Sequence, residues 1–143
     1  MRADGVELPR AQTEGVKGIL IRGRGRILLA YDGTPSARRA LHRAALIHRD
    51  GDEVAVIHVV EDGDDHDGHL EEAHRLLSER GIAATPIRAT GNPARSICVA
   101  AERDGYDTIV VGRRNMGDRG LLLLGSVAAR VVSGAACDVV VVA

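Results

Sequence analysis

The segment that decides the fold runs from Thr108 to Val132 and reads TIVVGRRNMGDRGLLLLGSVAARVV. Its first residues form a short apolar run, which predicts a buried strand. A loop rich in glycine and arginine follows, and the residues after Gly125 and Ser126 have the composition of a helix. A strand, a glycine-bearing loop and a helix start can together bind an anion, because the first N–H groups of a helix lack intrahelical partners and the helix dipole is positive there.

Two interpretations of the glycines in this segment stay open. Gly112 and Gly125 allow a backbone to approach a phosphate where any Cβ would collide, and Ser126 adds a hydroxyl. The same residues also fit ordinary turn and capping chemistry at the end of a strand and the start of a helix. Spacing alone does not separate the two, because lone glycine patterns are weak signals.

The composition bounds the function classes. A chain of 143 residues suits one domain with a single core, and a formal net charge of −1 gives no general attraction to nucleic acid or membranes. The absence of Trp and Phe counts against a single-strand nucleic-acid binder. No segment is apolar and long enough to span a membrane, and the N-terminus lacks the apolar core of a secretory signal, so we expect a cytoplasmic location. Cys98 and Cys137 are expected to be small buried residues without a disulfide.

Residues 1–25 and the rest of the chain differ in pattern. The first 25 residues carry scattered charge and glycine with one apolar patch, Val16–Ile21, which predicts a partly flexible extension. Residues 26–143 are predicted to form one folded domain. Strands are predicted over 26–32, 53–60, 82–89, 107–112 and 138–142, and helices over 35–50, 69–80, 93–104 and 126–135.

Turn and capping residues separate these segments. Thr34 and Asn92, each followed by proline, predict helix starts, and Gly51 and Gly105 predict helix ends. Pro86 places the third strand at or near an edge. Alternating strands and helices of these lengths predict an α/β fold with one parallel sheet and helices on both faces. Ligands of such sheets bind beyond the carboxyl ends of the strands, where the strand order reverses.

Three stretches resemble the universal stress protein family: RILLAYDGTPSARRAL from Arg26, VIHVVE from Val56, and the segment from Tyr106 to Val142. The resemblance implies a five-stranded, Rossmann-like parallel sheet of the adenine nucleotide alpha hydrolase type, with strand order 3-2-1-4-5. It also implies a homodimer paired through the last strand, and the apolar edge Val139–Val142 suits that role.

One branch of that family binds ATP through a Gly-x2-Gly-x9-Gly-Ser/Thr pattern. By the resemblance, Gly112, Asn115, Gly125 and Ser126 would hold phosphates, with Asn115 in place of a glycine. Asn adopts left-handed backbone angles more readily than other residues with a Cβ, but its side chain fills space that glycine leaves empty.

Three further residues are candidates by the same resemblance. Asp32 would lie near the ribose, with Gly33 in the same turn, and the backbone of Val59 would meet the adenine edge. Arg113, beside the phosphate loop, fits either phosphate neutralisation or an ordinary surface charge, as Arg114 and Arg119 do.

The sequence lacks the motifs of a fast enzyme. It has no Gly-x-Ser-x-Gly elbow and no Gly-x4-Gly-Lys-Ser/Thr motif, so no catalytic residue is predicted. The acidic, histidine-bearing stretch 61–74 lacks the calcium-loop order and fits a solvated loop better than a metal site.

We therefore expect a regulatory protein that binds ATP, ADP or AMP between strands one and four, with Mg²⁺ or Mn²⁺ on the phosphates. An unknown protein partner would read its nucleotide state. The alternative is a dimeric interaction module with a degenerate pocket, and a slow ATPase is a third hypothesis.

Overall fold

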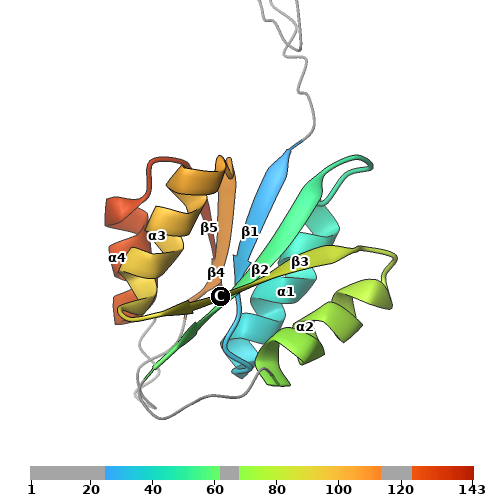
Figure 1. Cartoon of the computed structure of the whole chain (residues 1–143), viewed down its shortest axis with the longest axis horizontal. Helices are drawn as coiled ribbons and strands as arrows, with labels where there is room; N and C mark the ends of the chain where they lie inside the picture. The colour runs from blue at the N-terminus through green and yellow to red at the C-terminus, as the bar shows by residue number, and fades with distance from the viewer. Residues whose placement is uncertain (1–24, 62–67, 114–123) are drawn as a thin grey trace, which may run out of the picture.

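The computed structural model describes residues 25–61, 68–113 and 124–143 (Figure 1). Its centre is one parallel sheet with the strand order β3-β2-β1-β4-β5, as expected. The strands are β1 (Arg26–Ala30), β2 (Glu53–Val60), β3 (Ala84–Thr90), β4 (Thr108–Gly112) and β5 (Asp138–Val142). β1 is the central strand and pairs with β2 on one side and β4 on the other.

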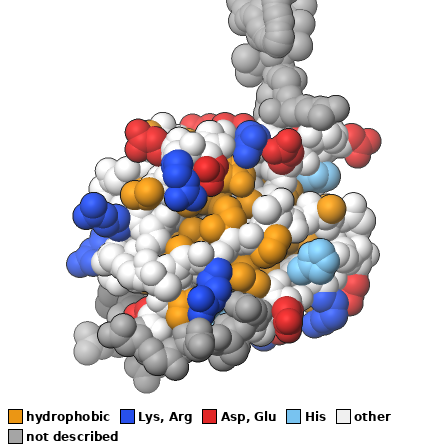
Figure 2. Space-filling model, viewed as in Figure 1, with side chains coloured by type: hydrophobic (Ala, Val, Ile, Leu, Met, Phe, Trp, Pro, Cys, Tyr) orange, Lys and Arg blue, Asp and Glu red, His pale blue; other side chains and the backbone are white. Residues whose placement is uncertain are grey.

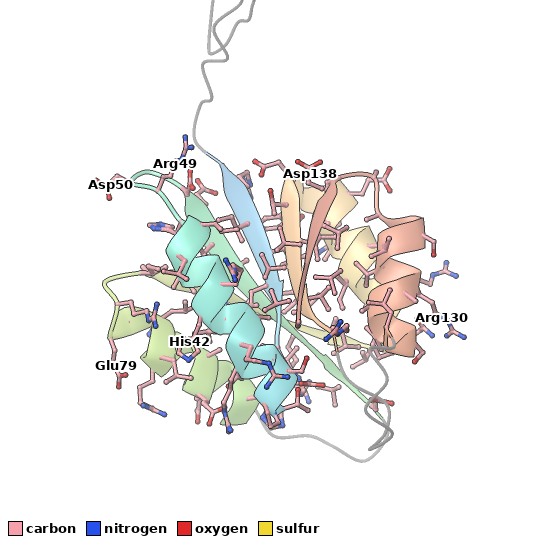
Figure 3. The ribbon with its side chains drawn as sticks, turned by 180° about the vertical axis from the view of Figure 1, so that it is seen from behind. His42, Arg49, Asp50, Glu79, Arg130 and Asp138 are labelled. Atoms are coloured by element: carbon pink, nitrogen blue, oxygen red, sulfur yellow. The ribbon has the colours of Figure 1, made fainter. Side chains whose placement is uncertain are left out.

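Four described helices cover both faces of the sheet. They are α1 (Pro35–Ile47), α2 (Gly68–Ser78), α3 (Pro93–Asp104) and α4 (Ser126–Gly134). α3 and α4 lie on the side facing the viewer in Figure 1, and α1 and α2 lie on the other side, which Figure 3 turns to the front. Successive strand residues point to opposite faces, so Leu29 packs in the core under α1 and α2, and Leu28 packs in the core under α3 and α4.

The helix starts form as the sequence predicts. The Thr34 hydroxyl accepts a hydrogen bond from the Ala37 N–H at 3.1 Å, and the Asn92 side-chain oxygen accepts one from the Arg95 N–H at 2.9 Å. The end of α3 is also confirmed, because Gly105 adopts left-handed angles with φ 74°. These caps satisfy backbone groups that a helix end leaves unpaired.

The predicted end of the first helix was wrong. α1 ends at Ile47, three residues before the expected Asp50, and Gly51 lies in the following turn with φ 91°. The carboxylate of Asp52 explains the early end. It accepts hydrogen bonds from the N–H groups of Arg49 at 2.9 Å and Gly25 at 2.8 Å, which ties the turn to the start of β1.

Two strand boundaries differ from the prediction by two residues. β1 ends at Ala30, although the Tyr31 N–H still bonds to the Ile57 carbonyl at 3.0 Å. β3 begins at Ala84, because the Ile82 N–H bonds to the Leu77 carbonyl and closes the end of α2. The edge position that Pro86 predicts for β3 is confirmed.

The described residues contain no disulfide and no helix that could span a membrane. None of the described helices has both the length and the apolar composition of a membrane span. On the face in Figure 2, hydrophobic side chains gather near the centre and charged side chains lie around them.

Cys98 and Cys137 are free, half-buried thiols, and burial raises the pKa of both, so neither has the low pKa of an activated nucleophile.

Candidate functional site

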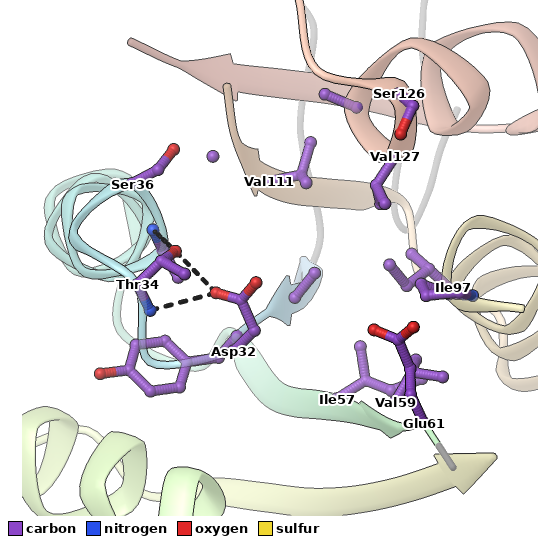
Figure 4. Close-up of a pocket in the computed structure, with 16 residues that line it drawn as sticks. Asp32, Thr34, Ser36, Ile57, Val59, Glu61, Ile97, Val111, Ser126 and Val127 are labelled. Carbon is purple, nitrogen blue, oxygen red and sulfur yellow. Dashed lines mark hydrogen bonds between the residues drawn. The ribbon is translucent and has the colours of Figure 1, made fainter. Parts of the chain in front are cut away.

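A cavity of about 210 Å³ opens at the carboxyl end of the sheet, beside the end of β1 (Figure 4). β2 and β3 follow β1 on one side of the sheet, and β4 and β5 are added on the other side of β1, so the strand order reverses between β1 and β4. This is the place where open parallel sheets bind their ligands. The cavity is lined from three strands, β1, β2 and β4, and from three helices, α1, α3 and α4.

The first turns of three helices meet at this cavity. Ser36 is the second residue of α1, Pro93 is the first residue of α3, and Ser126 is the first residue of α4. Each helix brings the positive end of its dipole, together with N–H groups that its own backbone does not bond. Their convergence favours a ligand with negative charge.

The helix start at α4 differs from the other two. Thr34 and Asn92 cap α1 and α3 with side-chain oxygens, but the N-cap of α4 is Gly125, which has no side chain. The first three residues of α4, Ser126 to Ala128, all line the cavity. Their N–H groups are therefore not capped by residue 125 and suit an acceptor from a ligand.

The Asp32 carboxylate lies across the cavity from the start of α4 (Figure 4). Asp32 Oδ1 accepts hydrogen bonds from the Thr34 N–H at 3.1 Å and from the Thr34 hydroxyl at 2.7 Å (Figure 4). Asp32 thus holds the residue that caps α1 while its carboxylate borders the cavity. Glu61, directly after β2, brings a second carboxylate to the cavity. The lining thus has carboxylates from the ends of β1 and β2 and, after β4, the start of α4 without a side-chain cap.

Apolar side chains form the remaining walls. They come from the ends of β2 and β4 and from the first turns of α3 and α4: Ile57, Val59, Ile97, Val111 and Val127. Val59 and Ile97 lie on the same side of the cavity in Figure 4. Such walls suit a flat apolar group, so the cavity can take a ligand with an apolar part, hydroxyl or amino donors, and an anionic part.

Gly112 is required by the packing of α1 on β4. A Cβ at this position would lie 2.6 Å from the Ser36 carbonyl oxygen and 2.7 Å from the Ser36 carbonyl carbon, and it would also meet the Ser36 hydroxyl. Only a glycine lets the first turn of α1 come this close to the end of β4. Gly112 also lines the cavity, and its contact with a phosphate stays a prediction.

Tyr31 anchors α2 next to the cavity. Its hydroxyl donates to the Glu72 carboxylate, and Glu72 also pairs with Arg38 at 3.2 Å. Burial and this hydrogen bond raise the pKa of Tyr31 to about 12. The hydrogen bond from Tyr31 lowers the pKa of Glu72, and Arg38 lowers it further.

The predicted site residues divide into three groups. Asp32, Val59, Gly112 and Ser126 line the cavity together. The second group, Gly33, Arg113 and Gly125, adjoins lining residues in the chain but is not part of the described lining; the Arg113 N–H bonds to the Val142 carbonyl at 2.7 Å. Asn115, with Arg114 and Arg119, lies outside the described residues.

The sequence interpretation missed several lining residues, chiefly Ser36, Glu61 and Ile97. A signal existed for Ser36, because Thr34 and Pro35 already predicted a helix start directly after the first strand. Every such helix start lies at the carboxyl end of a parallel sheet. No pattern in the sequence singled out Glu61 or Ile97.

Comparison with known proteins agrees with this architecture. The sequence profile described as the universal stress protein family matches residues 23–74 and 63–143. The chain belongs to this family. A universal stress protein of Thermus aquaticus is 35% identical over 132 residues, which cover 81% of this chain and 96% of that protein. A universal stress protein of Synechocystis is 32% identical over 131 residues, which cover 81% and 83%.

Solved universal stress protein structures share the fold. One from Archaeoglobus fulgidus has a TM-score of 0.74 at 25% identity and covers 85% of this chain and 100% of its own. A family member in complex with cAMP has a TM-score of 0.70 at 24% identity, covering 83% and 96%. One from Arabidopsis thaliana with AMP bound has a TM-score of 0.61 at 20% identity, covering 82% and 90%.

Proposed function

We propose that this universal stress protein is a regulatory protein that binds an adenine nucleotide, ATP, ADP or AMP, in the cavity beside β1. The observation that carries the proposal is the convergence of three helix N-termini on a cavity that the Asp32 carboxylate also borders, across from the start of α4 (Figure 4). The nucleotide-bound relatives, with cAMP and AMP, support the same ligand class.

The polarity of the cavity suggests how the ligand lies. Ribose hydroxyls would donate to Asp32, and the base would pack against Val59 and Ile97. The phosphates would accept hydrogen bonds from the start of α4, including the Ser126 hydroxyl. The N–H groups at the start of α4 and the Asp32 carboxylate would thus have complementary partners in the phosphates and the ribose of one nucleotide.

A divalent ion would come with the ligand. Among the described residues, no three His, Cys, Asp or Glu side chains are placed to share a metal ion. Mg²⁺ usually binds proteins through one or two carboxylates together with substrate phosphates. We therefore assign Mg²⁺ or Mn²⁺ to the phosphates of the nucleotide, where it would offset their charge.

The cavity lining supports binding rather than rapid turnover. The described lining holds no histidine, lysine or cysteine, and its acidic groups are the Asp32 and Glu61 carboxylates, of which Asp32 is assigned to the ribose. The proposed role is therefore regulatory, with the bound nucleotide changing the surface that a partner reads.

Thermal melts of the dialysed protein test the proposal. Millimolar ATP with magnesium, AMP and GTP are compared with buffer. A ligand at about a hundred times its dissociation constant adds roughly 2.7 kcal/mol to the free energy of unfolding, which raises the melting temperature by several degrees. We expect a rise with ATP or AMP and none with GTP. No rise with any nucleotide, in protein that mass spectrometry shows to be empty, would favour the interaction module.

A further inference from the structure

Ser36 carries a buried hydroxyl that no other described residue bonds. The residue is 7% exposed, and its Oγ makes no hydrogen bond within the part of the chain that the structure describes. Ser36 lines the cavity from the first turn of α1, a helix of 13 residues. A buried polar group of this kind costs stability unless something bonds to it, so its presence in a cavity needs an explanation.

Two other serines of the chain satisfy their hydroxyls locally. Ser133 donates to the Ala129 carbonyl at 3.0 Å, and Ser96 donates to the Thr90 carbonyl at 3.3 Å. Thr34, two residues before Ser36, bonds both to Asp32 and to the Ala37 N–H. The hydroxyl of Ser36 is not used in this way, although it stands at a helix start where hydroxyls commonly cap.

The surroundings of Ser36 fit an anion. The hydroxyl and backbone of Ser36 occupy the space that a Cβ on Gly112 would take, and Ser36 and Ser126 lie on either side of the end of β4 (Figure 4). Both serines belong to first turns of helices, whose dipoles favour negative charge between them. The carboxylates Asp32 and Glu61 come from the β1 and β2 side, so hydroxyl donors of a ligand have acceptors elsewhere.

We propose that the Ser36 hydroxyl donates a hydrogen bond to a phosphoryl oxygen of the ligand. The phosphate is then held between α1 and α4, and not by the segment between β4 and α4 alone. The inference rests on the proposed function, because it names a phosphate-binding residue of the same cavity. It also explains why a buried hydroxyl that has no partner among the described residues is present at this position.

The test compares Ser36→Ala with the control Ser133→Ala by isothermal titration with AMP and adenosine, and by ³¹P NMR with inorganic phosphate. We expect Ser36→Ala to bind AMP about ten-fold or more weakly, the loss typical of one hydrogen bond to a charged group. Its affinity for adenosine stays that of the wild type. The melting temperature of the ligand-free variant stays equal or rises, because an unpaired buried hydroxyl is removed. Ser133→Ala binds all three ligands as the wild type does.

Other outcomes would overturn the role of Ser36, the proposed function, or both. Equal AMP affinity of Ser36→Ala and wild type overturns the role of Ser36 and leaves the proposed function standing. An equal loss for AMP and adenosine overturns the assignment to phosphate. If the wild type binds inorganic phosphate but neither AMP nor adenosine, and Ser36→Ala loses that binding, the nucleotide proposal fails and the anion role of Ser36 holds. No binding of any of the three to the wild type overturns both.

Discussion

The imidazole ring of His69, in α2, fills the space that a side chain on Gly33 would occupy. A Cβ on Gly33 would lie 2.5 Å from His69 Cε1. The same ring packs edge-on against His58 of β2, with 4.9 Å between ring centroids, and His58 Nδ1 lies 3.0 Å from the Tyr31 carbonyl. α2 therefore packs directly behind the turn that presents Asp32 to the cavity, and the position of this helix and the shape of the turn depend on each other.

This contact predicts the effect of Gly33→Ala on stability. The change adds a Cβ at φ 79°, where alanine is strained, and also drives that Cβ into the His69 ring. Gly81→Ala is the matched control, because Gly81 has φ 77° with nothing within 4 Å of its Cβ position. In chemical denaturation, we expect Gly33→Ala to lose at least about 1 kcal/mol more than Gly81→Ala. Equal losses would mean that His69 moves aside without cost.

The approach of α1 to β4 predicts a second large effect. Gly112→Ala places a Cβ 2.6 Å from the backbone oxygen of Ser36, and a helix backbone cannot yield as a side chain does. We expect a loss of about 1–3 kcal/mol in the free energy of unfolding. Adding Ser36→Ala should not restore the loss, since it removes the hydroxyl and keeps the backbone contact. Full rescue by Ser36→Ala would show that only the side chain stands in the way.

Two substitutions at Asp32 separate its charge from its structural role. Asparagine keeps a side-chain oxygen that can accept both hydrogen bonds from Thr34, so Asp32→Asn should melt close to the wild type. Asp32→Ala loses these bonds and should lose about 1 kcal/mol of stability. If ribose hydroxyls donate to the carboxylate, both variants bind adenosine about ten-fold more weakly in titration calorimetry. Unchanged affinity in Asp32→Asn would reject the ribose assignment.

The network of Tyr31, Glu72 and Arg38 predicts a pH dependence. The pKa of Glu72 is lowered in the folded state, so its contribution to stability is complete above the ordinary value of 4.5 and is lost as the pH falls below it. Glu72→Gln does not titrate, so the wild type should be more stable by up to about 1 kcal/mol at pH 7, with partial exposure limiting the effect. The difference in stability between the two proteins should shrink as the pH falls from about 5 to about 3.

A matched glutamate controls this pH series. Glu79 also pairs with an arginine, Arg75 at 3.1 Å, but both side chains are 61% exposed. Glu79→Gln should show little pH-dependent difference from the wild type, because exposed pairs contribute little. A pH profile for Glu72→Gln that matches the one for Glu79→Gln would show that the Tyr31 hydrogen bond has no influence on stability.

The edge strand β5 predicts the oligomeric state. Val139, Val140 and Val141 are half-exposed, and β5 pairs only with β4 among the described strands. An apolar edge of this kind is a template for pairing with a second copy. We expect a dimer by light scattering at micromolar concentration and a monomer for Val141→Lys. Val132→Lys, at a 48% exposed valine of α4, should leave the dimer intact. A monomeric wild type would reject pairing through this edge.

Local interactions explain what the sequence alone determined. The apolar run of β1, the Thr34 and Asn92 caps and the glycine at 105 act within a few residues, so their patterns predicted strands and helix limits correctly. The exception, Gly51, has a different physical basis: Asp52 closes the turn there against Gly25, which is a contact between distant parts of the chain. The strand order came from the family resemblance, because periodicity does not determine which strands are neighbours.

Only the tertiary structure decided the composition of the cavity and the reasons for its glycines. Ser36, Glu61 and Ile97 are separate in the chain. They come together at the carboxyl end of the parallel sheet, where the crossover connections also place the starts of three helices. Gly33 and Gly112 fitted a ligand site in the sequence, yet the atoms that exclude a side chain there belong to His69 and Ser36. A sequence indicates where a backbone needs glycine, but the neighbour that imposes the need is fixed by packing between distant segments.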